Sequence, residues 1–189
     1  MNFYLRLTAI LIFAILHSYW RIADKGISKA LQFKNPLASL FEKSFLSYAQ
    51  FIVVLQLAGL SLFPKPQFPV IIQILAILIC LKGLIICITA RRTLGKNWTN
   101  AKDYKQSPAA HLVSSGIYSY IRHPIYLGLI LVFTGSEILA NSYLIILLPL
   151  LYLWFYNQAK KEEVLLLARF GKQYESYLSK TRMFIPYLI

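Results

Sequence analysis

The sequence predicts an all-α membrane protein, a polytopic bundle of about five transmembrane helices. Hydrophobic residues make up 58% of the 189-residue chain, whereas soluble domains are about 45–50% apolar. The mean hydropathy is +0.57, and the apolar residues are gathered into runs of the length that crosses a bilayer, about 20 residues. The basic residues flank these runs, as they do in membrane proteins.

The first three expected spans occupy the N-terminal half of the chain. The first covers about residues 3–20, and no small-residue cleavage site follows it, so we interpret it as an uncleaved span rather than a signal peptide. The second covers about residues 45–63 and is closed by a Pro-Lys-Pro triplet. The third covers about residues 68–90 and is closed by Arg91 and Arg92.

The fourth and fifth spans share one apolar run over residues 125–156, interrupted near Asn141 and Ser142. The fourth is short, so we expect these two spans to form a tight helical hairpin. Residues 160–178 then repeat apolar side chains at helical spacing. This pattern predicts a C-terminal helix that continues span five on the cytoplasmic side and is interrupted near Gly171.

The distribution of charge predicts the orientation. Lys and Arg gather in the loops after spans one and three and in the tail, whereas Lys65 is the basic residue of the opposite loops. The positive-inside rule therefore places the N-terminus outside and the C-terminus in the cytoplasm, in the inner membrane if the protein is bacterial. No Pro- or Gly/Ser-rich linker divides the chain, so residues 1–189 are expected to form one integral membrane domain.

The formal net charge of +13 suits contact with anionic lipid head groups. We expect no nucleic-acid partner, because no basic helix with interleaved aromatic residues occurs. Cys80 and Cys87 are seven residues apart, about 10 Å along a helix, which is too far for a disulfide. The three histidines are scattered without metal-ligand spacing, so no metal is expected.

The stretch from Gly116 to Gly128 combines Tyr118, Arg122-His123-Pro124 and Tyr126 at the start of span four. Proline is common in the first helical turn, so this stretch also fits an ordinary helix start with interfacial Arg and Tyr. Glu162-Glu163 in turn fits ordinary surface charge. A helical hairpin, however, brings Glu162 back to His123 and Tyr126, which builds a pocket with aromatic walls and a carboxylate.

Common nucleotide fingerprints are absent, because the chain contains no Gly-x-Gly and no Walker-type loop. A bound cofactor therefore needs another kind of pocket. Lys82 is a further polar residue within a span. The sequence leaves open whether it lines a substrate cavity or pairs with a neighbouring helix.

Residues 94–186 resemble the isoprenylcysteine carboxyl methyltransferase family, and also phospholipid methyltransferases. The resemblance rests on Leu94-Gly95-Lys96-Asn97-Trp98, on residues 112–118, on Arg122-His123-Pro124 with the following residues to Gly128, on Glu162-Glu163 and on residues 170–174 with Ile185-Pro186. Residues 1–92 match only as hydrophobic spans one to three.

This resemblance implies a membrane methyltransferase whose cytoplasm-facing S-adenosylmethionine pocket lies within residues 93–189. The acceptor would be a lipophilic small molecule or a lipidated molecule entering from the bilayer. Arg122 is the candidate for holding the acceptor or the cofactor carboxylate, and Glu163 or His123 for accepting a proton. The implied cofactor-binding residues are Ala110, His111, Leu112, Val113, Tyr118, His123, Pro124, Ile125, Tyr126 and Glu162.

One position departs from the family pattern. The eukaryotic enzymes carry an arginine one helical turn before the first glutamate, placed to meet a substrate carboxylate. Here Gln158 stands at that position beside Asn157, and a neutral amide cannot pair with charge. We take both as candidate acceptor-binding residues, and the acceptor is open between a prenylcysteine-like carboxylate and a lipid amine.

Two other functions are consistent with a helical C-terminal half of this kind. One is a membrane reductase of the sterol type that uses NADPH, with Lys96 and Lys102 as candidates for the cofactor's 2′-phosphate. The other is a non-catalytic membrane protein, which would bind no cofactor.

Overall fold

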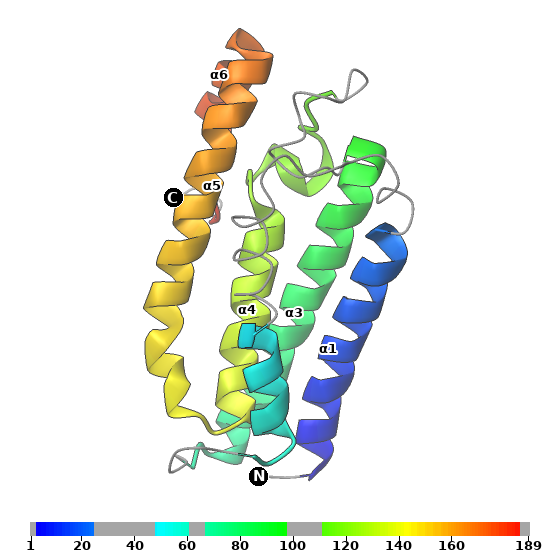
Figure 1. Cartoon of the computed structure of the whole chain (residues 1–189), viewed down its shortest axis with the longest axis vertical. Coiled ribbons are helices and arrows are strands. Elements are labelled where there is room, and N and C mark those ends of the chain that lie inside the picture. Colours follow the sequence, from blue (N-terminus) through cyan, green and yellow to red (C-terminus); the bar gives the residue numbers. More distant parts are fainter. Residues whose placement is uncertain (1–2, 25–47, 61–66, 98–110, 186–189) are drawn as a thin grey trace. The chain divides into compact units, whose positions relative to one another are not determined.

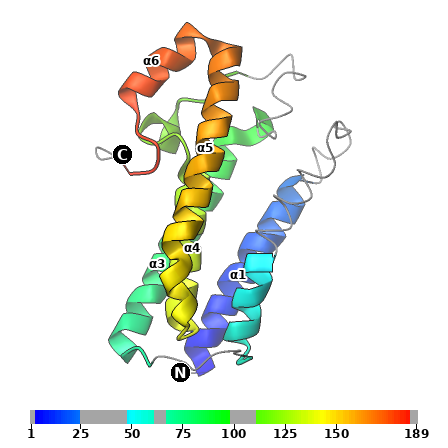
Figure 2. The ribbon, with the colours of Figure 1, turned by 60° about the vertical axis from the view of Figure 1, so that its left-hand side comes forward.

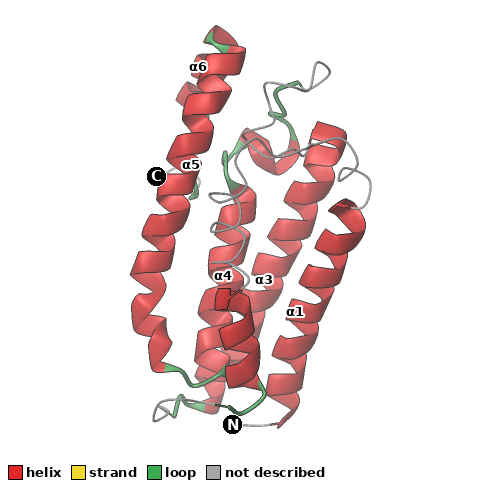
Figure 3. Ribbon diagram, viewed as in Figure 1, coloured by secondary structure: helices red, strands yellow, loops and turns green. Residues whose placement is uncertain are grey.

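The computed structural model describes residues 3–24, 48–60, 67–97 and 111–185, and its regular elements there are helices (Figure 3). This confirms the all-α prediction. Tyr48–Leu57 is helical. The labelled elements are α1 (Phe3–Asp24), α3 (Val70–Leu94), a 3-10 turn at Gly95–Asn97, another at Gly116–Ser119, α4 (Pro124–Leu139), a third 3-10 turn at Tyr143–Leu147, α5 (Leu148–Phe170) and α6 (Lys172–Lys180) (Figure 1).

The chain forms two compact units. The first consists of Met1–Leu81 with Leu131–Ile146, and the second of Lys82–Ile130 with Leu147–Ile189. Helices α3 and α4 each contribute one part to each unit, whereas α5 and α6 lie wholly in the second.

The first unit packs one face of α1 against its other helices. The buried residues of α1 are Ala9, Ile12, Phe13 and Leu16, which recur at the spacing of a helical face. Phe13 meets Phe133 of α4 edge to face, with ring centroids 6.2 Å apart. An edge-to-face ring pair stabilises the fold beyond the burial of its apolar area.

The turn after α4 lies in the first unit and is built from polar residues. Asn141 has a φ of 52°, a left-handed conformation that asparagine tolerates better than most residues. Its Oδ1 accepts a hydrogen bond from the Phe68 amide at 3.0 Å. Gln56 Nε2 donates to Ser142 Oγ, also at 3.0 Å. The predicted interruption near Asn141 and Ser142 is confirmed.

Helices α3 and α4 approach each other closely in both units. In the second unit a Cβ on Gly128 would lie 2.8 Å from the Gly83 carbonyl oxygen, so only glycine fits there. Gly135 lies against Cys80 in the same way in the first unit. Cys80 and Cys87 are buried and not bonded to each other, as their spacing predicts. Cys87 Sγ donates to the Ile125 carbonyl at 3.6 Å.

The second unit contains the reversal from α5 into α6. Helix α5 ends at Phe170. The next residue, Gly171, has a φ of 49°, and its amide donates to the Leu167 carbonyl. The chain then turns sharply, and α6 folds back from the end of α5 (Figure 2). Tyr174 and Tyr177 are the buried residues of α6. The predicted C-terminal helix and its break at Gly171 are both confirmed.

Within the described residues, α3 is the one helix long and apolar enough to cross a membrane; it has 25 residues. The apolar stretches Leu7–Tyr19, Tyr48–Leu57 and Pro124–Leu139 are helical but shorter. The count of five spans therefore stays a prediction. Lys82 lies exposed near the middle of α3.

Candidate functional site

The segment from Gly116 to His123 leads into α4 and carries the cationic half of the candidate site. Gly116 has a φ of 59° and starts a 3-10 turn that buries Tyr118. Ile121 then forms a parallel β-bridge with Arg182. Pro124 opens α4, where its missing N–H costs nothing. The Arg122 and His123 side chains thus project from a short non-helical segment between the 3-10 turn and α4.

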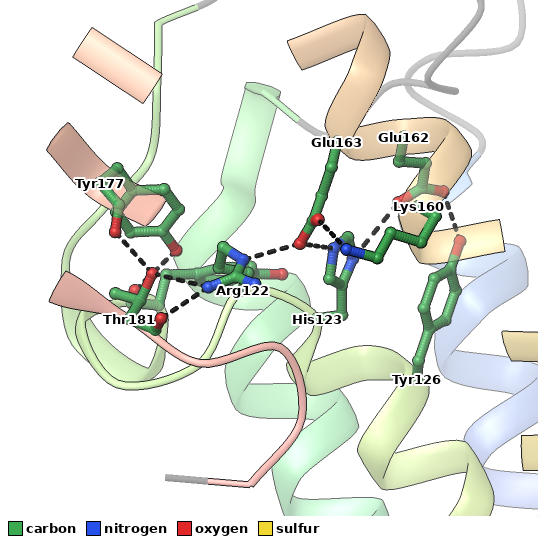
Figure 4. A network of polar contacts seen from close by, with 9 residues as sticks. Arg122, His123, Tyr126, Lys160, Glu162, Glu163, Tyr177 and Thr181 are labelled. Carbon is green, nitrogen blue, oxygen red and sulfur yellow. Dashed lines mark hydrogen bonds and ion pairs between the residues drawn. The ribbon is translucent and has the colours of Figure 1, made fainter. Parts of the chain in front are cut away.

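The carboxylates come from α5, which runs back past the start of α4. Glu163 is buried, and Glu162 is about one-third exposed, with a side-chain accessibility of 33%. They lie on either side of His123, with Nδ1 3.5 Å from Glu162 and Nε2 3.4 Å from Glu163 (Figure 4). The Tyr126 hydroxyl donates to Glu162. Glu162 thus contacts both His123 and Tyr126, as expected for a helical hairpin.

Glu163 also pairs with the two other cationic side chains of the site, Arg122 and Lys160. Arg122 Nε donates to Glu163 Oε1 at 2.7 Å, and Lys160 Nζ lies 3.8 Å from Oε2. The Arg122 and Glu163 side chains are only 12% and 10% exposed, so their pairing is shielded from solvent. Nη1 of Arg122 donates to the Thr181 carbonyl at 2.6 Å.

These contacts set the protonation of the cluster. Burial opposes ionisation of Glu163, but hydrogen bonds from His123 and Arg122 outweigh it and hold the pKa of Glu163 below its usual value. Burial alone would also lower the pKa of His123. The hydrogen bonds and negative charges of Glu162 and Glu163 outweigh that effect and raise it. The site therefore favours an ionised Glu163 beside a protonated His123.

Aromatic rings line the cluster. The His123 and Tyr126 rings are stacked, with centroids 5.5 Å apart and planes 4° apart. Tyr126 also packs on Phe155 of α5 at 5.1 Å. Phe184 from the C-terminal segment contacts His123 at 6.1 Å and Tyr152 at 5.6 Å. These rings form a packed aromatic group next to a partly exposed carboxylate.

The structure brings together five of the candidates, namely Arg122, His123, Tyr126, Glu162 and Glu163. The other candidates near the start of α4 are buried backbone neighbours of this cluster, namely Tyr118, Pro124 and Ile125.

The remaining candidates lie away from those contacts or outside the described residues. His111 is exposed, and its amide donates to Asn97 Oδ1 at 3.2 Å. Leu112 and Val113, which follow it, are half-buried. Asn157 is exposed and Gln158 half-buried on the turn of α5 that precedes the glutamates. Ala110 lies outside the described residues.

Sequence reasoning missed four residues that contact the site. The i,i+3 spacing of Lys160 and Glu163 was a usable signal for the first. The others are Tyr177, Thr181 and Phe184. Their contacts with Tyr118, Arg122 and His123 join residues 59–61 positions apart, and the contacts of Tyr177 and Thr181 use a backbone carbonyl. No local pattern identifies such contacts.

The chain resembles several known proteins in sequence and in fold. A model of the phospholipid methyltransferase family matches residues 71–173. A protein-S-isoprenylcysteine O-methyltransferase from Schizosaccharomyces pombe is 34% identical over 94 residues, 49% of this chain and 40% of that protein. A probable enzyme of the same name from Oryza sativa subsp. indica is 24% identical over 151 residues, 79% of each chain.

The chain spans about 40% of the length of the relatives from Schizosaccharomyces pombe, Xenopus laevis and Tribolium castaneum. Among solved structures, a eukaryotic intramembrane Ras methyltransferase, isoprenylcysteine carboxyl methyltransferase, has the same fold. Its TM-score is 0.60 at 21% identity, over 96% of this chain and 68% of that one. Because the family model covers more than half of the chain, the protein belongs to the phospholipid methyltransferase family, the integral membrane methyltransferases that include its isoprenylcysteine methyltransferase relatives.

Proposed function

We propose that this chain is an integral membrane methyltransferase that uses S-adenosylmethionine and acts on a lipophilic or amphiphilic acceptor. The observation that carries the proposal is the cluster of Arg122, His123, Tyr126, Glu162 and Glu163, found inside the segment that matches a methyltransferase family. The acceptor is the carboxylate of a prenylcysteine-like molecule or the amine of a lipid.

The donor set of the cluster fits the proposed cofactor. Glu162 is the more exposed carboxylate, and a carboxylate can accept hydrogen bonds from both hydroxyls of a ribose. The half-buried Tyr126 ring beside it, which stacks on His123, supplies apolar aromatic surface for a purine. Leu112, Val113 and Tyr118 are further proposed cofactor contacts, as the family resemblance implies. When bound, S-adenosylmethionine supplies a methyl group on a positively charged sulfonium and leaves as a neutral thioether.

The protein's own part in methyl transfer is chiefly positioning. An acceptor carboxylate needs no base, but it has to be aimed and stripped of water. Arg122, within the cluster, is the proposed holding group. Gln158 and Asn157 lie on α5, one turn before the glutamates. A lipid amine would also have to lose a proton. Of the two candidates, the ionised Glu163 is the group that can accept it, because His123 is already protonated in this cluster.

The proposed setting is a bilayer crossed about five times, with the N-terminus outside and the C-terminus in the cytoplasm. Helix α3 supports it by length and apolarity, and the one-sided basic loops support the orientation. In this arrangement the start of α4 and the glutamates of α5 lie at the cytoplasmic edge, where a water-soluble cofactor and a membrane-embedded acceptor can both reach them.

The first test is calorimetric binding of S-adenosylhomocysteine and, separately, of NADPH to the detergent-purified full chain. We expect saturable binding of S-adenosylhomocysteine and no heat from NADPH. Binding of NADPH alone would move the protein to the reductases. Binding of neither would contradict an enzymatic role for this site.

Variants link that binding to the cluster. Glu162→Gln removes the charge of the proposed ribose partner while keeping its size, and we expect binding to be lost or strongly weakened. The matched control is Glu175→Gln, which changes an exposed glutamate on α6. Normal binding by Glu162→Gln, with unchanged thermal unfolding, would show that the cofactor site is assigned wrongly.

A further inference from the structure

The C-terminal segment Thr181–Ile185 is joined to the start of α4 through backbone hydrogen bonds. The amides of Arg122 and His123 donate to the carbonyls of Arg182 and Met183 at 2.8 and 3.1 Å, and the Arg182 amide donates to the Tyr120 carbonyl at 3.1 Å. Amides just before a helix lack partners within the helix. The segment therefore supplies the acceptors that hold the backbone of Arg122 and His123 in place.

The same segment fixes the Arg122 side chain. Nη1 of Arg122 donates to the Thr181 carbonyl at 2.6 Å, while Nε donates to Glu163 at 2.7 Å (Figure 4). Thr181 is 2% exposed, and its hydroxyl donates to the Tyr177 carbonyl at 2.7 Å. The guanidinium plane is thus held from two sides, by α5 and by the C-terminal segment, and its fork geometry makes both contacts directional.

Phe184 packs against the His123 ring. Its side chain is 1% exposed, and its ring lies against His123 and Tyr152. His123 is itself 6% exposed, although both ring nitrogens face carboxylates. Hydrogen bonds and charge pairs are stronger when water is excluded. The Phe184 ring is one of the groups that keep water from the imidazole.

Helix α6 directly precedes this segment and fixes where it begins. The Tyr177 hydroxyl donates to the Tyr118 carbonyl at 2.7 Å, which joins α6 to the 3-10 turn at Gly116–Ser119. Tyr174, on the same helix, is fully buried. The segment is therefore anchored just before Thr181, and again at Phe184.

We infer that Thr181–Ile185 is a structural part of the proposed cofactor site, and that Phe184 is a positioning residue that holds His123 against Glu162 and Glu163. This inference rests on the proposed function. Phe184 acts by packing, and the Thr181 carbonyl acts by orienting Arg122. Cofactor affinity should then depend on a side chain that packs against the His123 ring while the two glutamates contact its nitrogens.

The test compares Phe184→Ala with Phe184→Leu in the detergent-purified full chain, by calorimetric titration with S-adenosylhomocysteine. Small displacements of positioned groups have large effects on recognition, so we expect Phe184→Ala to weaken binding by roughly tenfold to a hundredfold. Phe184→Leu keeps most of the apolar volume and should retain most of the affinity.

The matched control is Phe133→Ala, which removes an equally large buried ring from the first unit. It should lower the thermal unfolding temperature without changing the affinity of the folded protein. Equal affinity in Phe184→Ala and Phe133→Ala would overturn the inference, as would full loss of binding in a folded Phe184→Leu variant. Failure of the unaltered protein to bind would overturn the proposed function, and the inference with it.

Discussion

At the scale of single residues, the site depends on two adjacent carboxylates on α5 that share one imidazole. Glu162 and Glu163 would repel each other if both were ionised without cations nearby. His123 lies within 3.5 Å of both, and Arg122 and Lys160 add positive charge beside Glu163. The cations and anions of the cluster thus stabilise each other in a position where most of them are shielded from water.

The ion pair between Arg122 and Glu163 gives a stability prediction. Removing one partner of a shielded pair leaves the other charge without compensation, which costs about 3–5 kcal/mol. In Arg122→Ala, His123 and Lys160 remain beside Glu163, so we expect the free energy of unfolding to fall by the lower end of this range, about 3 kcal/mol, measured by chemical or thermal unfolding in detergent. Arg122→Met combined with Glu163→Leu should cost less than Arg122→Ala alone. A larger loss in the double variant would contradict this account.

His123 gives a prediction of pH dependence. Its pKa is raised in the folded protein, so its stabilising effect is complete below the unfolded value of about 6.5. That effect is lost as the pH rises through the higher folded value. The unfolding temperature of the unaltered protein should therefore exceed that of His123→Asn most at about pH 6, and the difference should shrink towards about pH 9.

The control for that comparison is His111→Asn, which removes an exposed imidazole bonded to Asn97 rather than to a carboxylate. A difference for His123→Asn that stays constant with pH, or grows as the pH rises, would refute the coupling between His123 and the glutamates.

At the scale of elements, the close approach of α3 and α4 positions the start of α4. A Cβ on Gly128 would meet the Gly83 carbonyl oxygen at 2.8 Å and Cys87 Sγ at 2.5 Å. The Gly83 carbonyl oxygen is a backbone atom, so it cannot move away without a shift of α3. His123 lies just before the first turn of this helix, so a shift of α4 would also move the imidazole.

We expect Gly128→Ala to destabilise the protein by about 1–3 kcal/mol, the usual effect of overpacking a buried contact. Adding Cys87→Ala removes the nearer obstacle and should recover part of the loss, but not all, because the Gly83 carbonyl remains. Thermal unfolding of both variants measures this. If Gly128→Ala caused no loss of stability, α3 and α4 would have to separate easily at this contact.

At the scale of the whole molecule, the orientation in the bilayer decides which compartment the site faces. The basic loops predict a cytoplasmic C-terminus and an external turn near Asn141. Tyr143 and Ser176 are exposed positions in that turn and in α6. They are suitable for a labelling experiment that reads out both sides of the membrane.

In intact bacterial cells, a membrane-impermeant maleimide should label Tyr143→Cys, whereas Ser176→Cys should react only after the cells are opened. Cys80 and Cys87 are both buried and are first replaced by alanine to remove background. The opposite labelling pattern would reverse the orientation, and labelling of both positions from outside would contradict a fifth span between them.

Much of the fold could be predicted because its signals are local. Pro124 at the start of α4, the left-handed Asn141 and the glycine at 171 each mark a helix end through their own backbone preferences. The meeting of Glu162 with His123 and Tyr126 also followed from the sequence, because a hairpin returns the chain to its starting side. The membrane spans were harder to predict, because shorter apolar helices carry a weaker signal.

The sequence by itself determined the helical class, the helix ends and the polar residues that gather at the start of α4 and in α5, because periodicity and composition act over a few neighbouring residues. Only the tertiary structure decided that Arg122 pairs with Glu163 and with the Thr181 carbonyl, and that Phe184 covers His123. Those contacts join residues 41–61 positions apart and partly use backbone atoms that every residue carries, so no side-chain pattern reveals them.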